Sequence, residues 1–108
     1  MVLTEDLTAT YDTRYKMNPP LRRRADLDVI RAGLADGTID AIATDHAPHS
    51  LELKEREFLI AAFGVTGLET ALGVVHREYV EPGHLTWDQV VALMSAAPAR
   101  ILLSLIHI

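Results

Sequence analysis

Hydrophobic positions recur at helical spacing in the first half of the chain. Within residues 25–35, Leu27, Ile30 and Leu34 are three and four residues apart, and Gly37 follows shortly after the pattern ends. Residues at these spacings share one face of an α-helix. A glycine just past the last periodic residue is a common helix stop. The pattern therefore predicts an amphipathic helix over residues 25–35.

Two more helical patterns occupy the last third of the sequence. Residues 66–69 have the spacing of a capping box, and apolar residues follow at helical intervals as far as Tyr79. Residues 86–89 repeat the capping pattern, and Pro98 can open a last short helix that runs through Leu102. Both capping patterns are typical of helix starts, and proline is tolerated in the first turn of a helix. The C-terminal part of the chain is therefore expected to be helical.

Two shorter stretches favour β-strands. Residues 13–17 have modest strand character, and two prolines after Asn18 force an extended exit. Lys16 is expected there as a solvated or paired strand residue. Residues 39–44 form an apolar run that only Asp40 interrupts, which is typical of a buried parallel strand. The order strand, helix, strand, helix, helix predicts an α/β protein with parallel strands joined by right-handed crossovers.

Composition narrows the class of protein. The chain has 108 residues, so it can bury a core, but it is well short of the roughly 250 residues of a complete (β/α)₈ barrel. Its 49% hydrophobic content is ordinary for a globular domain, and its net charge of −5 argues against nucleic-acid or anionic-membrane partners. No apolar run approaches the ~20 residues of a membrane span. We therefore expect a cytoplasmic protein that binds neither nucleic acid nor membrane.

Candidate chemistry gathers where the second predicted strand ends. The chain contains no cysteine, so any metal must be held by histidine or carboxylate ligands. Asp45, fixed at a strand end beside His46 and His49, could bind a divalent metal or move a proton, although Asp-His pairs are also common structural groups. Strand alternation points Asp45 and His46 to opposite sides, so His46 is assigned either a structural role or a role in supporting the residues that bind the ligand. His49 lies in the following loop, where it could reach a ligand or remain in water.

Two motifs carry a resemblance to a known family. Residues 16–22, Lys-Met-Asn-Pro-Pro-Leu-Arg, and residues 43–49, Ala-Thr-Asp-His-Ala-Pro-His, together resemble the signature pair of bacterial dihydroorotases. Phe63, Gly64 and residues 67–70 extend the similarity. Dihydroorotases belong to the cyclic amidohydrolase superfamily, and the chain resembles their C-terminal part.

The resemblance implies a fold for almost the whole chain. Residues 1–102 would be the last βα units of a (β/α)₈ TIM-like barrel of the metal-dependent hydrolases, followed by C-terminal helices. The barrel would be incomplete, because only its final units are represented. Residues 103–108 form an apolar tail unrelated to what precedes them, and we interpret them as non-native.

The resemblance also implies an activity. Dihydroorotases reversibly hydrolyse the cyclic amide of dihydroorotate to carbamoyl aspartate in de novo pyrimidine (UMP) biosynthesis, and they hold one or two zinc ions. Full-length members can form homodimers or associate with aspartate transcarbamoylase. The resemblance implies the same reaction, metal and partners for the full-length protein.

Site residues follow from the motifs. The resemblance implies that Asp45 ligates the metal, accepts the proton of the attacking water and passes it to the leaving ring nitrogen. Asn18 and His49 would hold the substrate by hydrogen bonds. Main-chain groups near Phe63 and Gly64 would close over the pyrimidine ring.

Two alternatives remain beside the dihydroorotase interpretation. Hydantoinases and allantoinases share an Asp-His pair near the last strand but generally lack the counterpart of Asn18. A non-catalytic dihydroorotase-like subunit is the second alternative, and such proteins tend to lose metal ligands, whereas Asp45 is retained here. The other metal ligands of the family would all lie before Met1, so we expect this chain to be inactive by itself.

Overall fold

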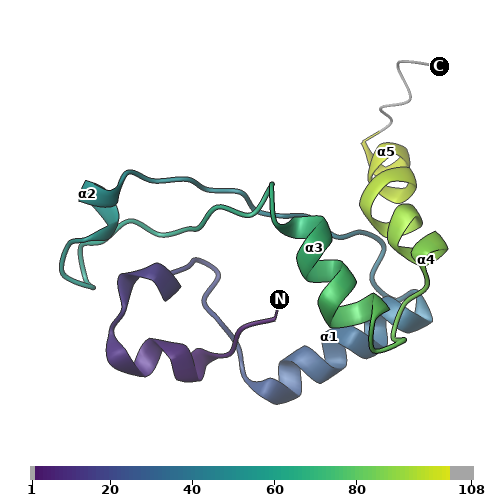
Figure 1. The fold of residues 1–108 in the computed structure, drawn as a ribbon, viewed down its shortest axis with the longest axis horizontal. Coiled ribbons are helices and arrows are strands. Elements are labelled where there is room, and N and C mark those ends of the chain that lie inside the picture. The colour runs from purple at the N-terminus through teal and green to yellow at the C-terminus, as the bar shows by residue number, and fades with distance from the viewer. Residues whose placement is uncertain (1, 103–108) are drawn as a thin grey trace. The chain divides into compact units, whose positions relative to one another are not determined.

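The computed structural model describes residues 2–102 and divides into two compact units. Residues 2–28 and 44–71 form the loop unit, and residues 29–43 and 72–102 form the helical unit. Figure 1 traces the elements in chain order. They are the 3₁₀ helices η1 (Glu5–Thr10) and η2 (Thr13–Tyr15), the α-helices α1 (Arg24–Asp36), α2 (Leu51–Lys54) and α3 (Ala71–Val75), the π-helix η3 (His76–Val80), α4 (Trp87–Val91), the π-helix η4 (Ala92–Ala96) and α5 (Ala97–Ile101).

The first predicted helix is confirmed as α1. Its side chains Leu27 and Leu34 lie two turns apart, and they are only 1% and 6% exposed. The helix ends at Asp36, and Gly37 adopts a left-handed backbone with φ of 83°. Glycine has no Cβ to clash in that conformation, so it stops the helix at little cost.

The helical unit is built mainly from two helical runs. In the first, α3 passes directly into η3, and the run ends at a turn in which the Gly83 N–H donates to the Val80 carbonyl at 2.9 Å. The second run begins at Thr86, whose hydroxyl accepts from the Gln89 N–H while the Gln89 side chain accepts from the Thr86 N–H. This reciprocal pair is the predicted capping box, and the helical C-terminal part is confirmed. The run continues through α4, η4 and α5.

Apolar side chains from both runs form the core of the helical unit. Tyr79 and Val90 are 3% and 2% exposed, and Leu85 seals the turn between the runs with its N–H donating to the Tyr79 carbonyl. Burial of such side chains is worth about 1.5–3 kcal/mol each. The buried hydrophobic residues of this unit are Leu34, Val75, Tyr79, Leu85, Val90, Leu93 and Ala97.

The two predicted strands are wrong, because the residues 2–102 contain no β-strand, only an isolated parallel bridge between Thr4 and Arg22. Residues 13–15 form η2 instead, since the Asp12 carboxylate accepts from the Arg14 N–H and starts a tight turn. Residues 39–44 have no regular structure, and the Ile42 N–H donates to the helical Leu93 carbonyl at 2.9 Å. A strand needs a neighbouring strand to satisfy its backbone groups, and the described part of the chain supplies none.

The capping box predicted at residues 66–69 is also wrong, because the helix begins later, at Ala71. The N–H groups of Gly67 and Leu68 are used by the His46 side chain, which accepts from both. Those residues are therefore part of the loop unit rather than of a helix start.

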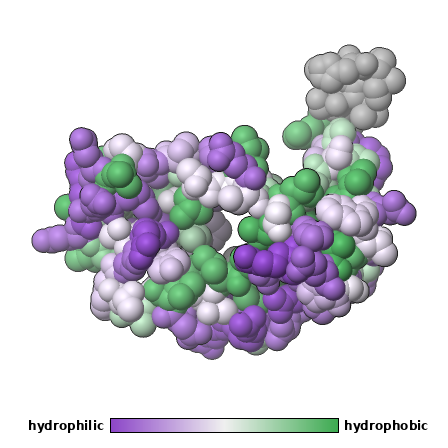
Figure 2. Space-filling view, viewed as in Figure 1, coloured by the Kyte–Doolittle hydropathy of each residue, from purple (hydrophilic) through white to green (hydrophobic). Residues whose placement is uncertain are grey.

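Large apolar side chains remain exposed in both units, and apolar surface is visible among the polar residues in Figure 2. Leu59 is 88% exposed and Val29 is 72% exposed. No helix within residues 2–102 has the length and apolar character needed to cross a bilayer. The tail at residues 103–108, interpreted above as non-native, lies outside the described residues.

Candidate active site

All five residues singled out from the motifs lie in the loop unit. Segments around Ala47 and Val65 run beside one another there, and the Ala47 N–H donates to the Val65 carbonyl at 2.9 Å (Figure 1). This pairing brings part of the predicted site together. The five residues are Asn18, Asp45, His49, Phe63 and Gly64.

His49 contacts the other predicted loop directly. Its Nε2 lies 2.7 Å from the Phe63 carbonyl oxygen, and a carbonyl can only accept, so Nε2 carries the proton. The Nδ1 atom is then the acceptor of the neutral ring. A substrate held by His49 would meet Nδ1, or it would have to displace the Phe63 carbonyl.

Gly64 is required at its position for two reasons. Its φ is 116°, a backbone conformation that side-chain-bearing residues rarely adopt. A Cβ at this position would lie 2.6 Å from the Cβ of Ala47, well inside van der Waals contact. The Gly64 N–H donates to the Lys16 carbonyl at 3.0 Å, which holds the peptide in place.

Asp45 and Asn18 are exposed, and no hydrogen bond or ion pair of either side chain is found within residues 2–102. Asp45 adopts a left-handed backbone with φ of 49°, and Asn18 precedes a cis proline. An exposed carboxylate without a protein partner is free to accept one from solvent or from a ligand. The structure therefore brings His49, Phe63 and Gly64 together and leaves Asn18 and Asp45 unengaged in this part of the chain.

The His46 side chain is engaged in backbone contacts, although the strand from which its role was predicted is absent from residues 2–102. Its Nδ1 accepts hydrogen bonds from the N–H groups of Gly67 and Leu68, at 3.0 and 3.1 Å. The His46 N–H in turn donates to the Thr44 hydroxyl at 3.3 Å. These bonds tie the segment that carries Asp45 to the segment that follows Phe63-Gly64.

Neither of the two lysines of the chain, Lys16 and Lys54, was predicted to belong to the site. Lys16 is only 6% exposed, so its expected place as a solvated or paired strand residue is wrong. Its Nζ donates to the carbonyls of Leu59 and Ala61, at 3.0 and 2.7 Å. Such long-range contacts leave no local pattern in the sequence.

Lys54 holds the next part of the same loop. Its Nζ donates to the carbonyls of Ala62 and Gly64, at 3.0 and 3.1 Å, and to that of Lys16 at 3.4 Å. Burial lowers the pKa of Lys54, the nearby Lys16 ammonium lowers it further, and the carboxylate of Asp12 acts in the opposite direction. Three carbonyl partners favour the charged form, because an ammonium has three protons to donate.

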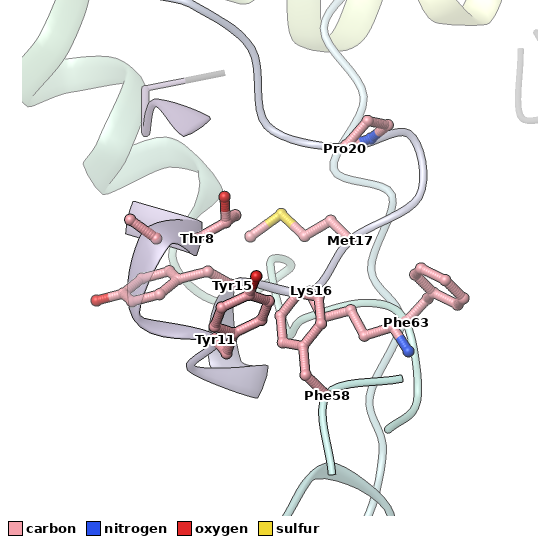
Figure 3. A pocket seen from close by; sticks show the side chains of 9 residues that line it. Thr8, Tyr11, Tyr15, Lys16, Met17, Pro20, Phe58 and Phe63 are labelled. Atoms are coloured by element: carbon pink, nitrogen blue, oxygen red, sulfur yellow. The ribbon is translucent and has the colours of Figure 1, made fainter. Parts of the chain in front are cut away.

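An aromatic cavity of about 420 Å³ lies beside Lys16 (Figure 3). The Lys16 ammonium lies 4.3 Å from the centre of the Phe63 ring and 5.6 Å from that of Phe58, within the range of cation–π attraction. Tyr11 meets Phe58 edge to face, with ring centres 5.5 Å apart. The cavity is lined by Thr8, Ala9, Tyr11, Tyr15, Lys16, Met17, Pro20, Phe58 and Phe63.

The donor set does not fit a complete metal centre. Among residues 2–102, no group of three or more His, Asp or Glu side chains is arranged to hold an ion. His46 uses Nδ1 as an acceptor and His49 uses Nε2 as a donor, so the Asp45 carboxylate and the His49 Nδ1 are the groups at this site that keep lone pairs for an ion. Zinc sites need three or more protein ligands. These residues alone would not hold zinc.

Comparison with known proteins identifies relatives over nearly the whole chain. A dihydroorotase from Leifsonia xyli is 56% identical over 101 residues, which cover 94% of this chain and 23% of that protein. Dihydroorotases from Endomicrobium trichonymphae and Streptomyces coelicolor are 52% and 50% identical and cover 92% and 94% of this chain. The chain thus spans about a quarter of the length of these relatives. No protein-family model matches it.

The chain is also similar to a solved structure from the same superfamily. A D-hydantoinase (dihydropyrimidinase) from Thermus sp. superposes with a TM-score of 0.74 at 29% identity, over 82% of this chain and 20% of that one. Hydantoinases are barrel-forming amidohydrolases, so the described helices and loops correspond to part of that fold although residues 2–102 contain no strand. The chain is therefore similar, over most of its length, to a segment of the cyclic amidohydrolases. Within that class it corresponds to a segment of dihydroorotase, and the predicted resemblance is confirmed.

Proposed function

We propose that the complete protein to which this chain belongs is a dihydroorotase, which reversibly hydrolyses the cyclic amide of dihydroorotate to carbamoyl aspartate in pyrimidine biosynthesis. The observation that carries this proposal is the 50–56% identity to dihydroorotases over nearly the whole chain. In this interpretation residues 1–102 are the C-terminal part of the barrel domain, and the isolated chain is inactive.

Asp45 is the proposed catalytic residue. Its exposed carboxylate would accept the proton of the water that attacks the ring carbonyl and pass that proton to the leaving ring nitrogen. One group can do both, because the carboxylate that takes the proton in the first step is the acid needed in the second. Its lack of a protein partner within residues 2–102 supports this role.

Asn18, His49 and the Phe63-Gly64 peptide are the proposed substrate contacts. The observed contact between His49 and the Phe63 carbonyl supports a shared role for these two loops. With its Nε2 occupied, His49 would offer Nδ1 to the substrate. The exposed amide of Asn18 can both donate to and accept from an amide group of a ring.

Zinc, one or two ions, is proposed for the complete protein only. Asp45 would contribute a single ligand, and the remaining ligands would come from the three quarters of the relatives' length that this chain does not span. A homodimer or an association with aspartate transcarbamoylase, and a cytoplasmic location, are parts of the same proposal.

The test is an assay of the complete protein, loaded with zinc, on dihydroorotate, a hydantoin and allantoin. We expect turnover of dihydroorotate and little of the other two. Asp45→Asn keeps the shape of the side chain but removes its basicity, so it should lower kcat by about 1,000-fold or more. Asp40→Asn is the matched control, because it replaces an exposed carboxylate of the helical unit by a carboxamide in the same way. It should leave kcat unchanged.

Each alternative predicts a different result. Faster turnover of a hydantoin would favour the hydantoinase interpretation, which the Thermus structure makes the natural competitor. A folded, zinc-loaded protein that turns over none of the three would favour a non-catalytic subunit and would refute the proposal.

A further inference from the structure

The carbonyl groups of the loop at residues 59–64 are held mainly by side chains, whereas four of its N–H groups donate to backbone carbonyls. The loop has no regular helix or strand hydrogen bonding, so its carbonyls need other partners. Within residues 2–102, five of its six carbonyls accept from lysine or histidine. Lys16 serves Leu59 and Ala61, Lys54 serves Ala62 and Gly64, and His49 serves Phe63.

The two lysines are linked to each other as well as to the loop. The Lys16 carbonyl accepts from the Gly64 N–H at 3.0 Å and from the Lys54 ammonium at 3.4 Å. The Ala62 N–H donates to the Leu53 carbonyl, one residue before Lys54. Residue 16, α2 and the loop therefore form one closed set of contacts.

The Phe63-Gly64 peptides are fixed from three directions by these contacts. His49 holds the carbonyl of Phe63, Lys16 holds the N–H of Gly64, and Lys54 holds the carbonyl of Gly64. Hydrogen bonds from a charged donor are stronger than neutral ones. Lys54 donates to the Gly64 carbonyl itself, to the preceding Ala62 carbonyl, and to the Lys16 carbonyl that accepts from the Gly64 N–H. It therefore holds these peptides directly and on both sides.

We propose that Lys54, assisted by Lys16, is a positioning residue that fixes the Phe63-Gly64 peptides for substrate binding. This inference rests on the proposed dihydroorotase function, because it assigns the substrate to these peptides. Lys54 itself does not touch the substrate in this scheme. It acts through the backbone that it holds.

Kinetics of the complete enzyme provide the first test. Backbone contacts to the ring are present in both the bound substrate and the transition state, so loosening them weakens binding uniformly. Lys54→Met keeps the length of the side chain and removes all three donors. It should raise KM for dihydroorotate about tenfold and change kcat less than about threefold. Lys54→Arg restores charge and donors and should recover at least part of the loss.

Arg56→Met is the matched control in the same exposed region. Its guanidinium donates only to the Glu52 carbonyl, at 3.3 Å, and makes no contact with residues 59–64 within the described chain. KM and kcat should therefore stay at wild-type values. A KM increase in Arg56→Met equal to that in Lys54→Met, or an unchanged KM in Lys54→Met, would overturn the proposal.

Limited proteolysis separates this inference from the proposed function. Chymotrypsin cleaves after exposed, flexible aromatic residues, and the loop contains Phe63 and directly follows Phe58. Cleavage there should be about tenfold faster in Lys54→Met than in wild type or Arg56→Met, at equal thermal stability of the enzyme. If the wild-type enzyme proves inactive on dihydroorotate, the function fails, and the cleavage rates still decide whether Lys54 fixes the loop. Equal cleavage rates in all three proteins would refute it.

Discussion

The loop unit and the helical unit are stabilised in different ways. In the helical unit, apolar side chains at helical spacing bury one another, and seven hydrophobic residues are nearly inaccessible to solvent. In the described part of the loop unit only Leu21, Leu27 and Ala61 are buried hydrophobic residues, and Lys16 is also buried. Lysine and histidine side chains there hold backbone carbonyls that no helix or strand satisfies.

The candidate site residues all lie in the loop unit, which is the unit held by polar contacts. A loop fixed by side chains can present peptide groups in shapes that regular structure does not allow, such as the positive φ of Gly64. The same loop depends on a few specific atoms, whereas an apolar core spreads its stability over many contacts. A single substitution should therefore destabilise the loop unit strongly, whereas the helical unit should lose stability in smaller steps.

The largest effect is expected from Gly64→Ala. The new methyl group would overlap the Cβ of Ala47, 2.6 Å away, and the residue would also be strained at φ of 116°. The overlap and the backbone strain together should lower the free energy of unfolding by roughly 3 kcal/mol or more. Amide hydrogen exchange at Ala47, whose N–H donates to Val65, measures the loss.

Gly83→Ala is the control for that experiment, in the helical unit. Its φ is 81°, so the backbone strain is similar, but nothing lies within 4 Å of the added Cβ. It should cost only about 1–2 kcal/mol. Equal costs for the two variants would show that the close approach of Ala47 and Gly64 does not constrain the loop.

A smaller effect is expected from Val90→Ala in the core of the helical unit. Val90 is 2% exposed, and its two lost methyl groups leave a small cavity, at a cost of about 2 kcal/mol. Val91→Ala changes the neighbouring residue by the same atoms, but Val91 is 59% exposed and should stay within about 0.5 kcal/mol of wild type. Urea unfolding followed by circular dichroism compares the two, and equal midpoints would contradict the packing described for this unit.

The smallest effect concerns one surface carboxylate in each unit. Hydrogen bonds from the Arg14 side chain lower the pKa of Asp12, and hydrogen bonds from Thr38 lower the pKa of Asp36. A depressed carboxyl pKa stabilises the fold above the unfolded value near 3.8, and this contribution is lost as pH falls through the folded pKa. Carboxyl titration by NMR at low and high salt should distinguish the two groups.

Salt should raise the pKa of Asp12 toward its usual value, because its partner Arg14 is a largely exposed charge 2.6 Å away. The pKa of Asp36 should change little, since Thr38 carries no charge. A salt response of equal size at both groups would contradict these causes.

The sequence predicted α1 and the capping box of α4 well because their signals are local. Leu27, Ile30 and Leu34 repeat within α1, and Thr86 and Gln89 form their capping box three residues apart. Strand predictions at residues 13–17 and 39–44 failed because a strand depends on a neighbour, and the described chain provides none. The resemblance to dihydroorotases was carried by motifs and did not depend on either strand.

The site was predicted in part. The motifs brought out His49, Phe63 and Gly64, which the structure places in contact. The role of Lys16 could not be read from the sequence, because its partners lie 43 and 45 residues away along the chain. Local patterns carry no record of such contacts, so the residues that hold the loop emerge only from the structure. The proposed catalytic role of Asp45 and the substrate-binding roles of Asn18, His49, Phe63 and Gly64 all stay predictions.

The stacked pair of His76 and Trp87 has a practical consequence for spectroscopy. The rings lie 5.3 Å apart at an angle of 17°, and Trp87 is the only tryptophan in the chain. Fluorescence excited through indole therefore originates in the helical unit alone. Its intensity and emission wavelength report on this stack, and the loop that carries Phe63 and Gly64 needs a dye or an isotope label of its own to be seen.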